Sequence, residues 1–163
     1  MTRIRKATIE HEGGMRFVAT TGSKRTIVYG DKIERGELSP VETLAVCLAA
    51  CSGMDVAPIA AKKRQRISRY TIEVEAEQRD EYPQILTQVV VTHIVEGPEV
   101  EEAAIRRSIE LSATKYCPVN AMFSAGATAV HHRYLVRNTG PEPFEADGEV
   151  IVTGPYRRPD VVA

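Results

Sequence analysis

The chain has no tryptophan, only three cysteines and almost no net charge: 21 basic and 22 acidic residues give −1 over 163 residues. Near-neutral charge excludes a general electrostatic attraction to nucleic acid or to an anionic membrane surface. No stretch approaches the ~20 uninterrupted apolar residues of a membrane span. The first residues, MTRIRKATIEHEGG, carry charges where a signal peptide needs apolar side chains. We therefore expect a cytoplasmic protein, whose thiols stay reduced rather than forming structural disulfides.

The order of the expected elements indicates an α+β domain. With 43% hydrophobic residues, the chain can bury one core of ordinary size. Strands are expected where β-branched and aromatic residues lie between turn residues, at 6–13, 15–20, 24–30, 69–78, 84–97 and 127–137. Helices are expected over 39–66, 98–116 and 117–126. This order predicts a mostly antiparallel sheet packed with helices.

The long first helix has a clear start and an internal proline. Ser39 is a good N-cap, Pro40 suits the first helical position, and Glu42 completes a capping box with Ser39. Pro58 is expected to kink this helix, because its ring displaces the carbonyl of Met54.

Two of the three cysteines lie on this helix. One apolar stripe should contain the residues spaced i, i+3, i+4 and i+7, which are Leu44, Cys47, Leu48 and Cys51. A free cysteine behaves as a small hydrophobe, so this pattern alone favours packing over chemistry. Cys47 and Cys51, without a nearby His or Asp, also make a poor zinc site. We predict no metal site here.

Cys117 stands directly before a proline, between two helical segments. A residue before proline avoids the α region, so the preceding helix should end near Tyr116. Pro118 suits the first position of a new helix, which places Cys117 at or next to its N-cap. The positive end of the helix dipole favours a thiolate there, and Lys115 adds a positive charge. The residues themselves do not indicate a partner for this thiol.

Four segments carry a family resemblance: SPVETLAVCLAACSGMDV, KKRQRISRYTIEVEAEQ, YPQILTQVVVTHIVEG and KYCPVNAMF. They are similar to the OsmC/Ohr family, which comprises osmotically induced protein C, the organic hydroperoxide resistance proteins and their relatives. The resemblance implies an OsmC-like domain over residues 1–138, with bent antiparallel sheets around two central helices in an intertwined homodimer. Residues 139–163 then form a Gly- and Pro-rich extension with one possible strand over 149–154.

The resemblance also implies a function and a pair of reactive residues. Cys51 resembles the cysteine that attacks the peroxide and Cys117 the cysteine that resolves the sulfenic acid. Proteins of this family reduce organic hydroperoxides without metal or flavin, so no cofactor is expected. A dithiol reductant, either a small molecule or a lipoylated protein, would restore the thiols.

A charged pair near the cysteine is the weakest part of the resemblance. Arg16 resembles the arginine that supports the thiolate in the organic hydroperoxide branch. In that branch a glutamate directly after the proline at the helix start holds the arginine. Here Val41 occupies that position, after Pro40, so the glutamate does not carry over. Glu42 lies nine residues before Cys51, on the opposite face of an ideal helix. The sequence therefore resembles the less characterised OsmC-like branch.

Two other functions stay open beside a cysteine peroxidase. One is a non-enzymatic dimeric binding protein that holds an apolar ligand and keeps its thiols as core residues. The other, a thiol hydrolase that uses Cys51 as nucleophile, ranks last because no histidine stands at motif spacing. His131 and His132 point to opposite faces of a strand and cannot form one site together, and His93 is interpreted as a structural residue.

Overall fold

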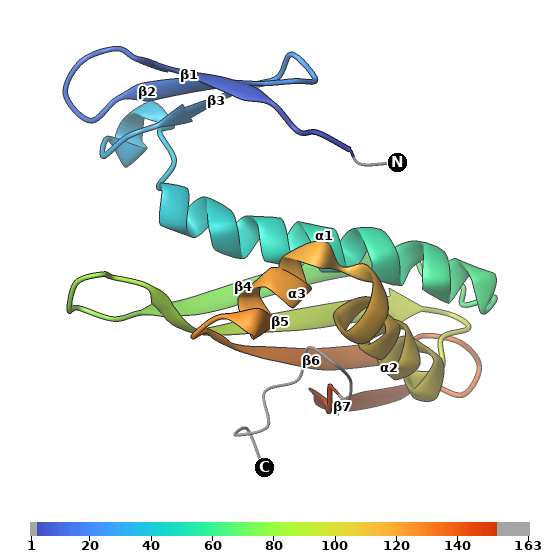
Figure 1. Ribbon diagram of the computed structural model, residues 1–163. Coiled ribbons are helices and arrows are strands. Elements are labelled where there is room, and N and C mark those ends of the chain that lie inside the picture. Colours follow the sequence, from blue (N-terminus) through green and yellow to red (C-terminus); the bar gives the residue numbers. More distant parts are fainter. Residues whose placement is uncertain (1–2, 153–163) are drawn as a thin grey trace. The chain divides into compact units, whose positions relative to one another are not determined.

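Figure 1 shows the computed structural model, which describes residues 3–152. The described chain consists of two compact units, one ending at Leu44 and the other beginning at Ala45. Each unit contains one β-sheet, and the helices complete a mixed α+β fold. The fold class predicted from the order of strands and helices is confirmed.

The first unit contains a small antiparallel sheet with little core. Its strands are β1 (Ala7–His11), β2 (Phe17–Thr21) and β3 (Thr26–Tyr29), in that order in the sheet. A 3₁₀ turn, η1 (Ile33–Arg35), follows β3. Only Ala19 and Glu37 are buried among the described residues of this unit. A three-stranded sheet normally needs a hydrophobic face against another layer to be stable.

The second unit contains a four-stranded sheet in the order β4 (Arg69–Gln78), β5 (Leu86–Gly97), β6 (Ala129–Asn138) and β7 (Phe144–Val150). β4 with β5 and β6 with β7 are antiparallel, whereas β5 and β6 are parallel. A parallel pair needs a long crossover connection. Here the crossover consists of α2 (Glu102–Leu111), a π-helical turn η2 (Ser112–Tyr116) and α3 (Pro118–Ala125).

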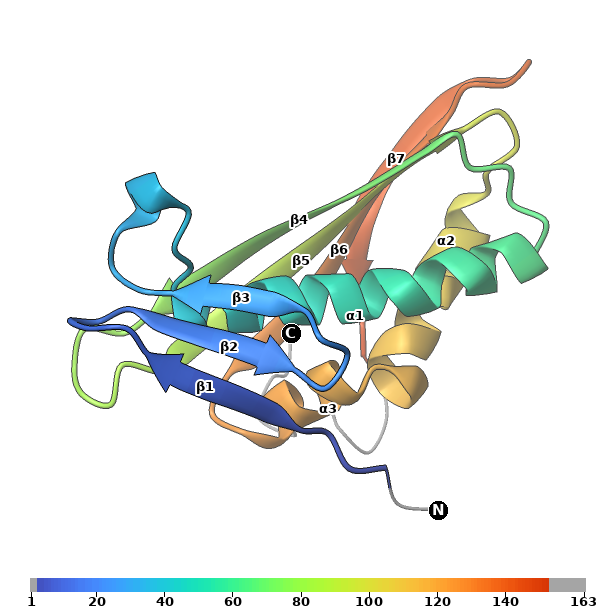
Figure 2. The same ribbon diagram turned by 90° about the horizontal axis from the view of Figure 1, so that it is seen from above.

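One face of this sheet is buried and contains apolar side chains together with two histidines, His93 and His132. Every second residue of β5 from Val89 to Val95 is fully buried, as side-chain alternation in a strand requires. The helices of the second unit lie against that face (Figures 1 and 2). Val56 of α1, Ile105 of α2 and Val136 of β6 belong to the resulting core.

α1 (Pro40–Lys62) is the longest helix and continues through Pro58 without interruption. It approaches β4 closely at Gly53, where a Cβ would lie 2.5 Å from the Cδ1 atom of Ile72. By length and composition alone α1 could cross a membrane, but the core helix of a soluble protein passes the same test. Leu48, Val56 and Ala60 of α1 are buried within the fold, so α1 fits a core helix.

The bounds expected for the second helix were wrong. The second helix begins at Glu102 rather than Pro98, because Glu99 pairs with Arg66 in a β-bridge and the Glu101 N–H donates to the Gln65 side chain. The π turn then shifts the helical phase, so that Tyr116 is half-exposed while Ser112 is buried.

The predicted apolar stripe on α1 was also wrong in part. Leu48 is buried, but Leu44 and Cys47 are exposed on the single chain. Helical spacing identifies residues on one face without fixing how much of that face the rest of the chain covers.

The strand predicted over 149–154 begins earlier than expected. β7 pairs with β6 from Phe144 to Val150, and residues 151 and 152 follow it outside the strand. The remainder of the predicted extension lies outside the described residues. The domain boundary at residue 138 stays a prediction.

Candidate thiol site

Two cysteines from different helices meet in the second unit. Cys51 lies on α1, and Cys117 is the N-cap of α3. The Cys117 N–H donates to the Ser112 carbonyl at 2.9 Å and closes the π turn, after which Pro118 begins α3. The Asn120 N–H donates to Cys117 Sγ at 3.3 Å. The N-cap position predicted from the Cys-Pro sequence is confirmed.

The two sulfurs are hydrogen-bonded. Cys117 Sγ donates to Cys51 Sγ at 2.8 Å, a separation longer than the ~2.05 Å of a disulfide bond. Burial and this donation to Cys51 raise the pKa of Cys117 to about 12, although the N–H groups of Asn120 and Val119 act in the opposite direction. The N–H groups at the start of α3 do favour the Cys117 thiolate, as expected, but burial and the contact with Cys51 outweigh them. In this contact Cys117 is the donor and Cys51 the acceptor.

Asp55 stands one turn after Cys51 on α1 and contributes a carboxylate to the site. An oxygen of Asp55 and the sulfurs of Cys51 and Cys117 all lie within 4.8 Å of one another. The buried Ser112 hydroxyl donates to Asp55 Oδ2 at 3.0 Å. The sequence interpretation, which found no Asp near the cysteines, missed this residue. Its i, i+4 spacing from Cys51 was the available signal.

Among the described residues, these three also form a group whose ligand atoms lie close enough together to hold a metal ion. Two thiolates on tetrahedral zinc, with Zn–S bonds of about 2.3 Å, lie about 3.8 Å apart. The sulfurs here are 2.8 Å apart, so they would have to separate before a metal could bind between them. The geometry favours chemistry between the sulfurs over metal binding.

A buried chain of polar side chains leads from the sheet to Cys117. Tyr70 Oη is 2.6 Å from His93 Nδ1, His93 Nε2 is 3.3 Å from His132 Nδ1, and His132 Nε2 is 2.9 Å from Asn120 Oδ1. His93 Nε2 also lies 3.4 Å from the Ser52 hydroxyl. Asn120 in turn donates to the Ala113 carbonyl at 2.8 Å. These contacts hold Asn120 in place, and its backbone N–H donates to Cys117 Sγ.

His93 and His132, the two histidines in this series of polar contacts, are neutral near pH 7. Burial lowers the pKa of His93 to about 3, with the neighbouring His132 adding to the effect, and burial lowers the pKa of His132 to about 4. Neutral imidazoles offer one donor and one acceptor each. One direction of donation, from Tyr70 through His93 and His132 to Asn120, therefore satisfies every contact along the chain.

The sequence interpretation gave these histidines no joint role. His131 and His132 do point to opposite faces, since His131 contacts Glu149 at 2.7 Å while His132 is buried. The pairing of strands brings the two residues together: β5 places His93 on the same face of the sheet as His132 of β6. That pairing could not be read from the sequence, because β5 and β6 are parallel and separated by the crossover.

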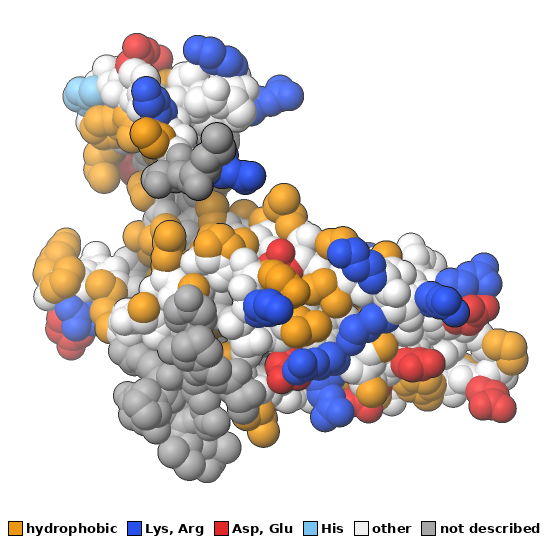
Figure 3. Space-filling view, turned by 45° about the vertical axis from the view of Figure 1, so that its right-hand side comes forward, with side chains coloured by type: hydrophobic (Ala, Val, Ile, Leu, Met, Phe, Trp, Pro, Cys, Tyr) orange, Lys and Arg blue, Asp and Glu red, His pale blue; other side chains and the backbone are white. Residues whose placement is uncertain are grey.

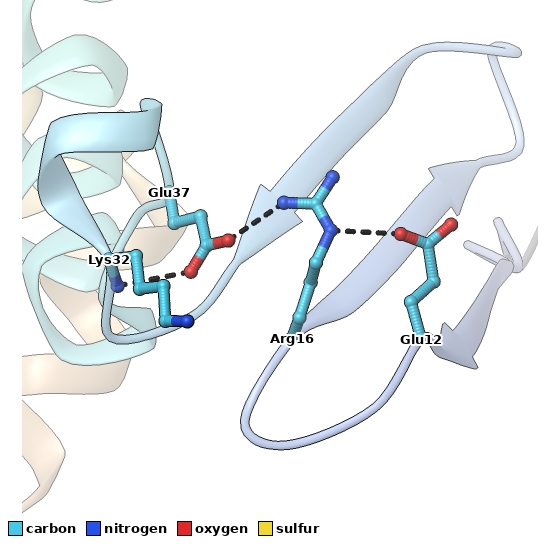
Figure 4. A network of polar contacts seen from close by, with 4 residues as sticks. All are labelled: Glu12, Arg16, Lys32 and Glu37. Atoms are coloured by element: carbon cyan, nitrogen blue, oxygen red, sulfur yellow. Dashed lines mark hydrogen bonds and ion pairs between the residues drawn. The ribbon is translucent and has the colours of Figure 1, made fainter.

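Arg16 lies in the first unit, in a network of charges shown in Figure 4. Its guanidinium donates to the exposed Glu12 at 2.9 Å and to Glu37 at 2.8 Å. Glu37 is only 3% exposed and also accepts the Lys32 N–H at 3.0 Å. The acidic partner of Arg16 is thus Glu37, which the sequence interpretation missed. Arg16 and the two cysteines belong to different units, so a role for Arg16 beside Cys51 stays a prediction.

Comparison with known proteins gives the thiol site a family context. Residues 31–132, which include both cysteines, match the family described as OsmC-like protein. The chain belongs to the OsmC-like family. Over 131 residues it is 29% identical to protein YhfA of Escherichia coli strain K12, a match that covers 80% of this chain and 98% of YhfA.

Solved OsmC-like structures share the fold. The crystal structure of a hypothetical protein from Aquifex aeolicus VF5 has a TM-score of 0.73 at 29% identity, and the match covers 83% of this chain and 97% of that one. The organic hydroperoxide resistance protein OhrB of Bacillus subtilis has a TM-score of 0.56 at 18% identity, covering 81% of this chain and 98% of OhrB. The likeness to OhrB concerns the fold alone.

Proposed function

We propose that this OsmC-like protein is a cysteine peroxidase that reduces organic hydroperoxides, with Cys51 as the attacking and Cys117 as the resolving residue. The observation that carries the proposal is the 2.8 Å contact between the two sulfurs, in which Cys117 donates to Cys51. Membership of a family that includes named hydroperoxide resistance proteins supports the substrate class.

The two sulfurs suit successive steps of one reaction. The Cys51 thiolate attacks the distal peroxide oxygen, the O–O bond breaks, and an alcohol leaves once its oxygen is protonated. Cys51 is then a sulfenic acid, and Cys117 attacks its sulfur, releasing water and forming a disulfide. A dithiol reductant would return both residues to thiols by exchange. This sequence needs neither metal nor flavin.

Mass spectrometry after a sub-stoichiometric pulse of an alkyl hydroperoxide tests this function. The intact chain should lose two hydrogens in mass, and peptide mapping should find Cys51 joined to Cys117. Cys117→Ser should react once, give a sulfenic acid that a dimedone-type reagent traps, and then over-oxidise. Cys51→Ser should lose fast peroxide consumption.

Cys47→Ala provides the matched control. Cys47 is exposed and makes no contact with the other sulfurs in the described structure. Its replacement should leave disulfide formation unchanged and shift the free energy of unfolding by no more than about 0.5 kcal/mol, as surface substitutions usually do. A Cys47–Cys51 disulfide would contradict the assignment of Cys117. If all thiols stay free in excess peroxide, the chain is better explained as a dimeric binding protein for an apolar ligand.

A further inference from the structure

Asp55 is placed to move protons for both sulfurs. Its carboxylate and the two sulfurs lie within 4.8 Å of one another. That range allows transfer through one bridging water, and hydrogen bonds of catalytic groups are often long before the substrate binds. Among the described residues, no other carboxylate or imidazole is grouped with both sulfurs in this way.

The reaction proposed above requires a proton to move at each of its two steps. The first step needs a proton removed from Cys51 and a proton delivered to the leaving oxygen of the hydroperoxide. The second needs a proton removed from Cys117 and a proton delivered to the oxygen that leaves the sulfenic acid. A single carboxylate can serve both steps, because it ends each of them deprotonated.

Hydrogen bonding keeps this carboxylate in place. The Ser112 hydroxyl donates to Asp55 Oδ2 at 3.0 Å and lies 3.4 Å from the Ser52 hydroxyl, which contacts His93. Ser112 and Ser52 are fully buried, so their orientation does not depend on bulk water. Ser112 also accepts the Cys117 N–H through its carbonyl. One residue therefore positions both the carboxylate and the resolving cysteine.

We propose that Asp55 is a catalytic acid and base for Cys51 and for Cys117, a role that rests on the peroxidase function proposed above. In the first step Asp55 takes the Cys51 proton, the thiolate sulfur bonds to the distal oxygen, the O–O bond breaks, and the leaving alkoxide takes the proton from Asp55. In the second step Asp55 takes the Cys117 proton, the sulfur–sulfur bond forms, and the hydroxide that leaves Cys51 takes that proton. The sum is two thiols and one hydroperoxide giving a disulfide, an alcohol and water.

The second step depends most on this base. Burial and the contact with Cys51 hold the Cys117 thiol protonated at neutral pH. Once Cys51 is oxidised, the thiol of Cys117 must still lose its proton to become a nucleophile. Without a neighbouring base, hydroxide from solution would have to remove it. The rate would then rise tenfold per pH unit until the thiol is ionised.

Stopped-flow measurement of disulfide formation in Asp55→Asn tests this role. Asparagine has nearly the same size but cannot accept a proton. We expect the sulfenic acid to form more slowly than in the wild type and then to persist, because the disulfide should form about 10²-fold more slowly at pH 7, within the range typical of general acid–base catalysis. Between pH 6 and 9 the rate should rise tenfold per unit in the variant and much less in the wild type. A purely structural role would not change the shape of this profile.

Three further variants complete the test. Asp80→Asn, in the exposed loop after β4, is the matched control and should behave as wild type. Asp55→Glu should retain more of the rate than Asp55→Asn, and formate should restore part of the rate to Asp55→Ala, which also decides the case if Asp55→Asn does not fold. Wild-type rates and profile in Asp55→Asn, with Cys51→Ser inactive, would overturn the role of Asp55 and leave the peroxidase intact. Absence of any disulfide in the wild type would remove the proposed function itself.

Discussion

At the scale of single residues, Glu37 gives its neighbour Arg16 a structural role. Its carboxylate is buried, accepts hydrogen bonds from Arg16 and from the Lys32 N–H, and lies against Gly30, where a Cβ would overlap it. The hydrogen bond from Arg16, followed by that from Lys32, holds the pKa of Glu37 below its ordinary value of 4.5. Arg16, considered in the sequence only as support for a thiolate, is therefore the partner of a buried charge.

Arg16→Met should consequently loosen the first unit, contrary to the small effect expected of a surface arginine. Removing the guanidinium leaves the Glu37 carboxylate buried with one hydrogen bond fewer, which is costly for a charge. Amide hydrogen exchange in β1, β2 and β3 should accelerate in this variant at pH 7. Glu12→Gln, which removes only the exposed partner of Arg16, should have a much smaller effect.

The difference in amide exchange between Arg16→Met and the wild type should depend on pH in a definite direction. A carboxylate whose folded pKa is lowered stabilises the fold above its unfolded pKa, and the contribution is lost as pH falls through the folded pKa. The difference in exchange between Arg16→Met and wild type should therefore be largest at neutral pH and shrink below pH 4. A difference that persists unchanged at pH 3 would show that packing of the Arg16 stem, rather than its charge, is responsible.

At the scale of elements, the paired strands β5 and β6 bury two histidines in their neutral form. Their folded pKa values of about 3 and about 4 lie below the ordinary value of 6.5. The unfolded chain therefore binds protons below pH 6.5 that the folded chain does not, and the free energy of unfolding falls as pH falls. For the pair, the loss between pH 7 and pH 5.5 should be about 2–3 kcal/mol, since each pH unit below 6.5 costs ~1.4 kcal/mol per group.

Urea unfolding at pH 7 and pH 5.5 measures this loss. His132→Gln should reduce the pH dependence by about half, even though the variant is less stable at pH 7. His131→Gln is the control, because His131 lies on the other face of β6 against Glu149. Equal pH dependence in wild type and His132→Gln would mean that other groups control stability in this range.

The sequence predicted local structure better than contacts between distant elements. Capping, proline and alternation located β4, β5, α3 and the N-cap at Cys117, because these signals act within a few residues. The true start of α2 depended on Gln65 and Arg66, more than thirty residues away. The two buried histidines were missed for the same reason, because their neighbours come from the crossover and the parallel strand pair, whereas Asp55 had a local signal in its i, i+4 spacing from Cys51.

At the scale of the whole molecule, the single chain leaves many apolar side chains uncovered. Figure 3 shows apolar side chains on the surface between charged ones. On α1, Val46 is 53% and Met54 is 79% exposed, and Cys47 is also exposed. The strand β1 is exposed along its whole length. Apolar side chains that one chain leaves exposed along a long helix are available for contact with a partner, and a second copy of the chain is the occupant that the family resemblance implies.

We therefore predict that the protein is an obligate homodimer. If folding and association are linked, the melting temperature should rise with protein concentration, and light scattering should give twice the mass of the 18.0 kDa chain.

Met54→Lys places a charge on the exposed apolar face of α1 and should weaken the dimer at least tenfold, because an unpaired charge would have to be buried at the contact. Tyr82→Lys, at an equally exposed loop position, is the control and should leave the dimer unchanged. On a monomer, both substitutions would shift the free energy of unfolding by only ~0.5 kcal/mol, as at other surface positions. A monomeric mass together with a melt that does not depend on concentration would contradict the prediction.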